Sequence, residues 1–376
     1  MLSFFADNGK PILMLMAVCM AYLVKSLPVN LVDVVTATPY FRCSDPRDHL
    51  YSLLSLTRAG STRLKADYTL SPEEVCTQFA VSTLVSDQNM RVLSLAPHTE
   101  LAQVGGPPPG RPTLQVPSWV PDLTRQGALN PLVSYTIRPQ IFRAGGPPGT
   151  EPGASLSADG KQLRLRGRIV DAVAEMARCQ VDVPFPTDEE VRPRSGLPAR
   201  AKKRMVNWIR ECRSIAGEEH RAEGPEEDVA AGRAFLETLA CGMTAMRDPL
   251  PEEVLVAMQV YVDYLSAYFV DGSTMSEDVW TTMLTYGVLC EQSLLSIAES
   301  RRFCRTAQGR FGQVRADARH GDVFACIAGA EVPYLLRPSP GREGLYRLIG
   351  DSFLSGVMQG EAWSDGRYST VDIAIE

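Results

Sequence analysis

The sequence predicts an α+β protein, in which an N-terminal helical region precedes a small β-barrel-like domain that a helical insertion interrupts. Three observations lead to this fold class. Residues 1–103 carry two strong helix-start signals. After residue 300, short segments alternate apolar and polar residues between glycine turns. An isolated segment with the same alternation, Gln162–Ile169, lies far upstream, and helical patterns fill the interval.

The composition indicates a globular chain and names no ligand. Of its 376 residues, 45% are hydrophobic and 22% charged, close to the averages of folded proteins. The net charge of −6 argues against a nucleic-acid partner, since phosphate neutralisation needs a basic face. The nine cysteines never occur at the spacing of metal or redox sites. We therefore expect reduced, mostly buried thiols in a cytoplasmic protein, with no metal and no cofactor. A protein partner and the oligomeric state stay open.

The segment Ile12–Val24 is a run of 13 apolar residues between Lys10 and Lys25. A transmembrane helix needs about 20 residues, so the run predicts a buried core helix and argues against a membrane partner. A signal sequence or membrane anchor is the alternative. The buried helix is preferred because Met1–Asp7 is apolar and acidic, whereas a signal peptide begins with a basic region.

The first helix-start signal of the N-terminal region predicts a helix over Asp45–Leu56. Asp45 can cap the free backbone N–H groups, Pro46 suits the first helical position, and Asp48 adds a carboxylate to the first turn. Together with Arg47, the two aspartates could instead form an acid–base cluster. Capping with a local ion pair explains the same residues without a reaction, so a structural role is expected.

A second helix is predicted to start at the capping box Ser71–Glu74, with a proline at its first position. Residues 104–154 then read as a glycine- and proline-rich linker from which helices are excluded. Within it, Pro117–Asp122 is extended, and Trp119 is expected to anchor the linker to the first region. The run Gly105–Gly110 lacks the lysine and the serine or threonine of a phosphate-binding loop.

The strand Gln162–Ile169 is predicted to have its arginines on a solvated face. Residues 192–228 are dense in charge and predict a surface loop. Their basic cluster, Arg200–Arg204, could be a nuclear-localisation or nucleic-acid patch, but a solvated linker is preferred because acidic residues follow. Helices are expected at 233–239, 252–269 and 277–299, the last with Ser276 as its cap.

Five strands are predicted near the C-terminus, at 303–306, 311–314, 323–327, 333–337 and 345–349. Glycines 309, 312, 321 and 329 are expected in turns with positive φ. The upstream strand lacks a partner and the C-terminal strands leave an open edge, so we expect them to pair. Residues 155–185 plus 301–362 would then form one barrel-like domain, with 186–300 as a charged loop and helical insertion and 363–376 as a tail.

Taken in order, these segments resemble the region downstream of the HET domain in fungal heterokaryon-incompatibility proteins. The family pattern is a DPRD helix, a DYxxSxxEV helix, a PSWVPD segment, an LxG strand with a following aspartate, and a series of glycine-rich C-terminal strands. In this chain the motifs occupy residues 45–56, 67–75, 117–122, 165–171, 301–312, 321–323, 329–338 and 346–361. The HET domain itself is expected before residue 45, and its motifs YxxLSYxWG and DxxCIxQ do not occur in the sequence.

The resemblance implies a non-catalytic scaffold or regulatory portion of a protein linked to non-self recognition and incompatibility cell death. The family's nucleotide-processing candidate domain would be absent. A stand-alone hydrolase or transferase is the alternative, but no catalytic residue, cofactor-binding residue or metal ligand is predicted, because Cys212 or Cys241 with His220 or His320 matches no signature. The family-motif residues, expected to be structural, are Asp45, Pro46, Arg47, Asp48, Trp119, Asp122, Gly321, Asp322, Arg337, Gly350, Gly360 and Glu361.

Overall fold

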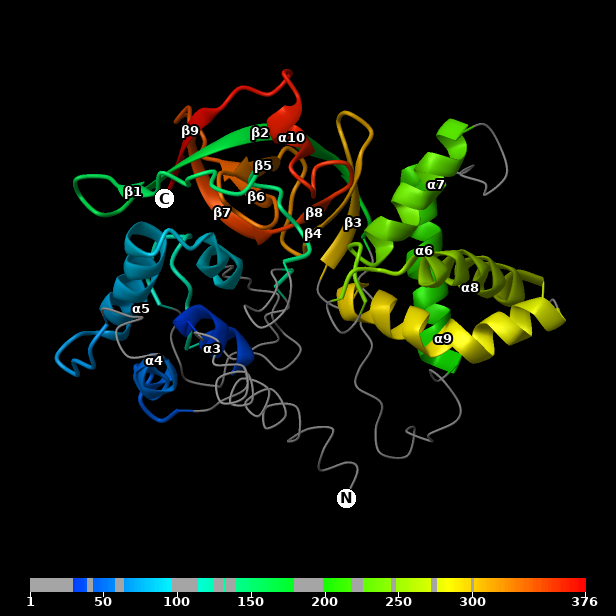
Figure 1. Ribbon diagram of the computed structural model, residues 1–376, viewed down its shortest axis with the longest axis horizontal. Coiled ribbons are helices and arrows are strands. Elements are labelled where there is room, and N and C mark those ends of the chain that lie inside the picture. Colours follow the sequence, from blue (N-terminus) through cyan, green and yellow to red (C-terminus); the bar gives the residue numbers. More distant parts are fainter. Residues whose placement is uncertain are drawn as a thin grey trace. The chain divides into compact units, whose positions relative to one another are not determined.

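The computed structural model describes residues 30–38, 43–57, 64–96, 114–124, 131–132, 140–178, 199–217, 226–244, 248–271, 276–298 and 301–376. The chain divides into two compact units (Figure 1). The first unit comprises Met1–Val170, Asp322–Asp351 and Val357–Glu376. The second comprises Asp171–Gly321 and Ser352–Gly356. The segments Ile12–Val24 and Gly105–Gly110 lie outside the described residues.

The helices of the first unit are short. They are α3 (Leu31–Ala37), α4 (Asp48–Tyr51), α5 (Pro72–Val81) and α10 (Glu361–Ser364), with helical turns η1 (Leu54–Leu56), η2 (Ser82–Ser86) and η3 (Met90–Leu95). The predicted capping box of α5 is confirmed, since Ser71 Oγ accepts the N–H of Glu74 and the Glu74 carboxylate accepts the N–H of Ser71. The apolar residues Val75, Cys76, Phe79 and Ala80 of this helix are buried.

The strands of the first unit form a barrel-like sheet in the order β5-β6-β7-β9-β2 (Figure 1). Neighbouring strands are antiparallel except β7 and β9, which run parallel, and β5 has an additional pairing with β2. Their bounds are β1 (Ser155–Leu156), β2 (Leu163–Met176), β5 (Val323–Ile327), β6 (Tyr334–Pro338), β7 (Leu345–Asp351) and β9 (Val371–Ile375).

The upstream strand β2 pairs with one of the predicted C-terminal strands, β5, as expected, and also with the unpredicted β9. In the first unit, Leu163 and Leu165 of β2 lie opposite Ile375 and Ile373 of β9, and all four side chains are buried. Each fully buried aliphatic side chain contributes about 1.5–3 kcal/mol relative to exposure. Strand β9 itself was not predicted, since residues 363–376 read as a tail.

The second unit combines helices with a small antiparallel sheet. Its helices are α6 (Ala199–Ala216), α7 (Glu226–Leu239), α8 (Glu252–Asp271) and α9 (Glu277–Ala298), and its strands are the end of β2, β3 (Arg301–Thr306), β4 (Phe311–Arg315) and β8 (Phe353–Leu354). The strands pair in the order β2-β3-β4-β8. One apolar core unites residues of all four helices with Phe303 and Phe311.

Three local expectations were wrong. The charged stretch expected as a loop contains α6, because its apolar residues Met205, Trp208 and Cys212 recur at helical spacing and are fully buried. Gly312 has no positive φ and lies within β4, opposite Cys304. Arg168 is not on a solvated face, since it donates to the Ala362 carbonyl at 2.8 Å and its guanidinium lies over the Trp363 ring.

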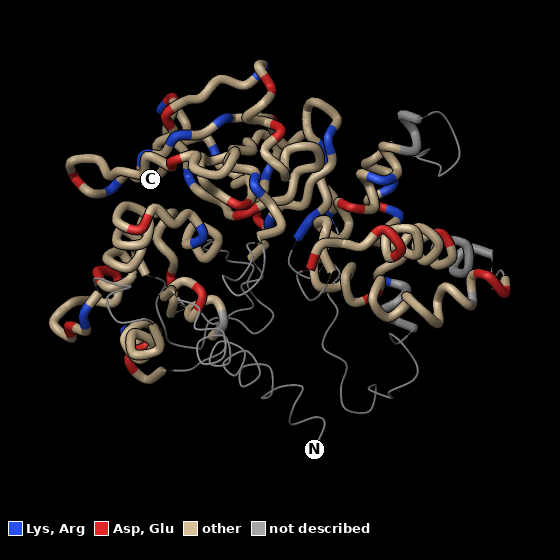
Figure 2. The backbone as a smooth tube through the Cα atoms, viewed as in Figure 1, with Lys and Arg blue, Asp and Glu red and all other residues tan. Residues whose placement is uncertain are grey.

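Charged residues of both signs are interspersed along the described backbone (Figure 2). No helix within the described residues is long and apolar enough to cross a membrane. In the same part of the chain, no group of three or more histidine, cysteine, aspartate or glutamate residues is placed to hold a metal ion.

Candidate functional site

The motif that begins at Asp45 forms a tight turn before a short helix. The N–H of Asp48 donates to the Asp45 carbonyl at 3.1 Å, and α4 runs only to Tyr51. Asp45 Oδ1 accepts the backbone N–H of Arg47 at 2.9 Å, as in an Asx turn. The expected capping role is therefore corrected: Asp45 satisfies an amide of the turn, because Pro46 and Arg47 are turn residues and α4 starts after them.

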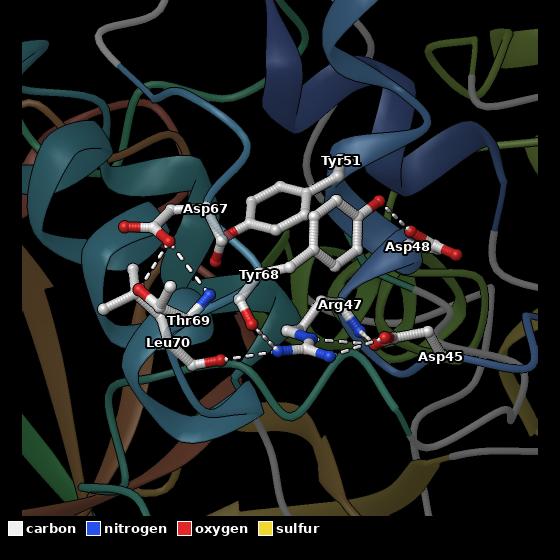
Figure 3. Close-up of polar contacts among 8 residues, drawn as sticks. All are labelled: Asp45, Arg47, Asp48, Tyr51, Asp67, Tyr68, Thr69 and Leu70. Carbon is white, nitrogen blue, oxygen red and sulfur yellow. Dashed lines mark hydrogen bonds and ion pairs between the residues drawn. The ribbon is translucent and has the colours of Figure 1, made fainter.

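Arg47 joins two motif segments that are distant in sequence. Its Nε and Nη2 atoms bind the Asp45 carboxylate at 3.0 and 2.7 Å. Its Nη1 atom donates to the carbonyl oxygens of Tyr68 and Leu70 at 2.6 and 3.0 Å (Figure 3). The planar guanidinium has its donors in a fixed fork, which suits one carboxylate and two converging carbonyls. The DPRD turn thus holds the segment that leads into α5.

Two tyrosines complete this network (Figure 3). The Tyr68 hydroxyl donates to Asp48 Oδ1 at 2.6 Å, and the Tyr51 hydroxyl donates to the Asp67 carbonyl at 3.0 Å. The two rings meet edge to face with centroids 5.2 Å apart, and the Arg47 guanidinium carbon lies 5.2 Å from the centroid of the Tyr68 ring. We refer to the eight residues of Figure 3 as the N-terminal clamp.

The electrostatics of the clamp do not suit acid–base chemistry. The hydrogen bonds from Arg47 lower the pKa of Asp45 from 3.8 to about 2. The hydrogen bond to Asp48 raises the pKa of Tyr68. The hydroxyl of Thr69 lowers the pKa of Asp67. A general base works best with a pKa near the working pH. The shifts move the pKa values of Asp45, Asp67 and Tyr68 away from that range.

We expect Arg47→Gln to weaken the clamp in a pH-dependent manner. A carboxylate with a depressed folded-state pKa contributes stability above its unfolded pKa and loses it as the pH falls through the folded pKa. The melting temperature of the wild type should therefore exceed that of the variant at pH 6. The difference should shrink between roughly pH 4 and pH 2. The part of the melting-temperature difference that comes from the hydrogen bonds of Arg47 to the Tyr68 and Leu70 carbonyls should persist at low pH.

The matched control for Arg47→Gln is Arg164→Gln, which removes an exposed guanidinium that makes no hydrogen bond or ion pair in the described part of the first unit. Melting curves of the three proteins from pH 2 to pH 6 make the comparison. A constant offset for Arg47→Gln across this range would contradict the assigned role of the Asp45 ion pair.

A second motif pair lies in the barrel-like sheet of the first unit. Arg337 at the end of β6 binds Asp322, directly before β5, with Nε–Oδ1 at 2.8 Å and Nη2–Oδ2 at 2.9 Å. The Asp322 side chain is 2% exposed. Gly321 takes φ +85° in the preceding turn, as expected, and Gly350 takes φ +145° in β7. These motif residues therefore have structural roles at the ends of strands and within the sheet.

The predicted anchor segment is well packed. Trp119 is fully buried, and its Nε1 donates to the Lys161 carbonyl at 3.3 Å. Asp122 accepts the backbone N–H of Leu114 at 3.2 Å and both the N–H and hydroxyl of Thr124 at 3.1 and 2.6 Å. Both side chains hold the segment within its own unit.

The last motif pair closes a loop. Gly360 precedes α10 with φ +90°, and a Cβ at this position would lie 3.2 Å from the Arg143 carbonyl. A side chain would thus be both strained and crowded there. Glu361 accepts the N–H of Gln359 at 2.7 Å. The pair therefore shapes the turn into α10.

Sequence reasoning missed one charged network of the first unit. Arg91 of η3 contacts Asp33 of α3 at 2.7 Å and Glu331, before β6, at 3.1 Å. All three side chains are largely buried. No local pattern predicts these contacts, because the partners lie far apart in the chain.

The cysteine–histidine candidates are not brought together in the described structure. Cys212 and Cys241 are fully buried in the second unit, whereas His320 is exposed and His220 lies outside the described residues. Six of the seven described cysteines are buried. Burial raises the pKa of Cys76 to about 12 and that of Cys290 to about 11, which disfavours the reactive thiolate.

The ordered motifs and the barrel-like sheet define a class of fungal proteins, and residues 255–368 match the model of the Het-6 β-barrel domain. The chain is also 25% identical over 357 residues to heterokaryon incompatibility protein 6, OR allele, of Neurospora crassa. Both matches support a fungal protein of the heterokaryon-incompatibility (HET) family.

The alignment with the Neurospora protein covers 85% of this chain and 49% of that relative. The chain thus spans about half the length of the curated relative that it matches. No solved structure matches the chain.

Proposed function

We propose that this chain is the non-catalytic scaffold or regulatory portion of a HET-family protein that acts in non-self recognition and incompatibility cell death. The observation that carries the proposal is how the motif residues are used. Arg47 and Asp45 bind each other and join chain segments, Asp322 binds Arg337, and Asp122 binds backbone and a neighbouring threonine. Because these charged motif residues are engaged in contacts that hold the fold together, their use supports a structural role for the chain.

The partner in this proposal is a HET domain, supplied on the same or another chain. A scaffold needs a defined surface and a stable fold, and the clamp stabilises the N-terminal part of the first unit. The name of the Neurospora relative associates that protein with heterokaryon incompatibility. By extension, we place this chain in the same process. The domain bounds predicted from the sequence, 155–185 plus 301–362 around an insertion, stay part of the proposal.

The proposal is tested by expressing the chain in a filamentous fungus in two forms. One form is the chain alone, and the other replaces the matched half of the Neurospora protein. Growth arrest and uptake of a membrane-impermeant dye report cell death. We expect the joined form to support cell death and the chain alone to leave hyphae growing normally.

The control is the joined form carrying Leu165→Asp, which should have reduced activity because the substitution destabilises its scaffold. The alternative function, a stand-alone hydrolase or transferase, predicts turnover by the purified chain. We expect NAD and related nucleotides to stay intact in its presence, as followed by chromatography. Cell death caused by the chain alone, or turnover that co-purifies with it through successive columns, would favour the alternative.

A further inference from the structure

The second unit contains an open hollow of about 420 Å³. It lies between the end of α6, the helix α7, the β3–β4 hairpin and the turn after β8. Small-molecule sites usually measure roughly 300–1,000 Å³, so the hollow suits a small ligand. The lining residues that matter most are Ala216, Ala231, Ala234, Arg305, Arg310 and Phe311.

The strand register directs Arg305 towards this hollow. Arg305 of β3 lies directly opposite Phe311 of β4, so the two side chains share one face of the hairpin. The Phe311 ring meets Phe235 of α7 edge to face, with centroids 6.3 Å apart. The Arg305 side chain therefore leaves the hairpin on the face that α7 covers. It is exposed, and within the described residues it makes no hydrogen bond or ion pair.

Arg310 provides a second cation, and its guanidinium is held in place by neighbouring side chains. Its Nη1 lies 3.4 Å from the buried Asp171 carboxylate and 3.3 Å from Gln308 Oε1. A Cβ built on Gly356 would lie 4.0 Å from Arg310 Nε, which places the guanidinium beside that turn. Asp171 compensates the charge of Arg310, so Arg305 carries the net positive charge of the hollow.

The opposite wall is small and apolar. Ala231 and Ala234 are three residues apart in α7 and face the same side of the helix. A larger side chain at either position would project into the hollow. Ser355 lies at the rim, and its hydroxyl has no hydrogen-bond partner within the described residues. The hollow thus pairs an available cation and a hydroxyl with an apolar wall.

We propose that this hollow binds a small organic anion. Its carboxylate or phosphate would be held by Arg305, with Arg310 and Ser355 at the rim, and its apolar part would lie on Phe311 and the alanines. Guanidinium groups recognise both headgroups through paired hydrogen bonds. The site is independent of the scaffold role proposed above, since none of its residues belongs to the N-terminal clamp.

Binding of benzoate and phenyl phosphate to the full chain tests this site, with benzyl alcohol as the neutral probe. Ligand-observed NMR titrations should show saturable binding of at least one anion. Arg305→Gln should weaken it about tenfold, the usual effect of losing a charge-assisted hydrogen-bond pair. Ala231→Leu keeps the arginine but narrows the hollow at its apolar wall, and should weaken binding. Arg164→Gln, at an exposed strand position of the first unit, should bind like the wild type.

Preference for one anion identifies the headgroup, and either preference supports the site. Equal weakening by Arg305→Gln and Arg164→Gln, or benzyl alcohol binding as tightly as the anions, would overturn the proposal. The proposal would also be overturned if neither anion bound saturably with a Kd of about 10 mM. Ordinary ligand efficiency gives this Kd for a probe of this size. Circular dichroism checks the fold of each variant, and Arg305→Lys, which keeps the charge and loses the fork, replaces Arg305→Gln if the latter does not fold.

Discussion

Replacing Leu165 with aspartate is expected to lower the free energy of unfolding of the first unit by about 2–5 kcal/mol. Leu165 is 1% exposed and lies in β2 opposite the fully buried Ile373 of β9. The substitution removes a packed isobutyl group and places a carboxylate among apolar side chains. Either the carboxylate is protonated or the strands separate, and both outcomes cost stability. Urea unfolding followed by circular dichroism measures the loss.

The matched control for Leu165→Asp is Arg164→Asp on the same strand. Arg164 points to the opposite face and is exposed, so this change should stay within about 0.5 kcal/mol of the wild type. Equal losses for the two variants would show that any acidic residue disturbs β2. A stable Leu165→Asp variant would mean that the β2–β9 face is not a core.

Strand β2 was predictable because its first residues alternate between buried and exposed, which produces a period of two. Burial does not alternate in β4, which is buried throughout, so the turns between the C-terminal strands carried that part of the prediction. Strand β5 occupies the predicted residues Val323–Ile327, and the other C-terminal strands shift by only a few positions, whereas β2 continues past the predicted end at Ile169 to Met176. Strand β9 escaped notice because it is short and buries only Ile373 and Ile375 fully. Its parallel partner β7 precedes it by a long connection, which a local pattern does not reveal.

Helix α6 was missed for a different physical reason. Its basic residues dominate the composition of the segment, and a charge count averages over all faces of a helix. The buried residues Met205, Ile209 and Cys212 lie on one face, and the charges lie on the others. Periodicity carries the signal in such a helix, whereas composition hides it.

The candidate site was predictable in its residue types but not in its partners. The aspartates beside a proline indicated a turn or helix start, and a local Asp45–Arg47 ion pair was expected and is present. The contacts of Arg47 with the carbonyls of Tyr68 and Leu70 depend on how the chain returns after α4. Hydrogen bonds to distant backbone groups leave no local pattern, so only the folded structure shows them.

Trp119 fastens an extended segment to the barrel-like sheet of the first unit. Its neighbour Ser118 accepts the N–H of Leu348 in β7 at 2.9 Å and donates to the Glu376 carbonyl, while the Ser118 N–H donates to the same carbonyl at 3.1 Å. The indole fills the interior, with its N–H on the Lys161 carbonyl. The segment therefore acts as a strap across β7 and the C-terminal end of the chain, and the indole holds the strap in place.

Replacing Trp119 with alanine should cost about 3–5 kcal/mol, because it removes the largest fully buried side chain of the strap and leaves a cavity. Trp119→Phe is the control, since it keeps much of the apolar volume and loses the hydrogen bond, at about 1–2 kcal/mol. Urea unfolding gives the global cost. Hydrogen exchange at Leu348 gives the local one: its amide should exchange faster in Trp119→Ala, because a loosened strap withdraws Ser118 Oγ. Unchanged protection of Leu348 in a destabilised Trp119→Ala protein would show that the indole fills space without holding the strap on β7.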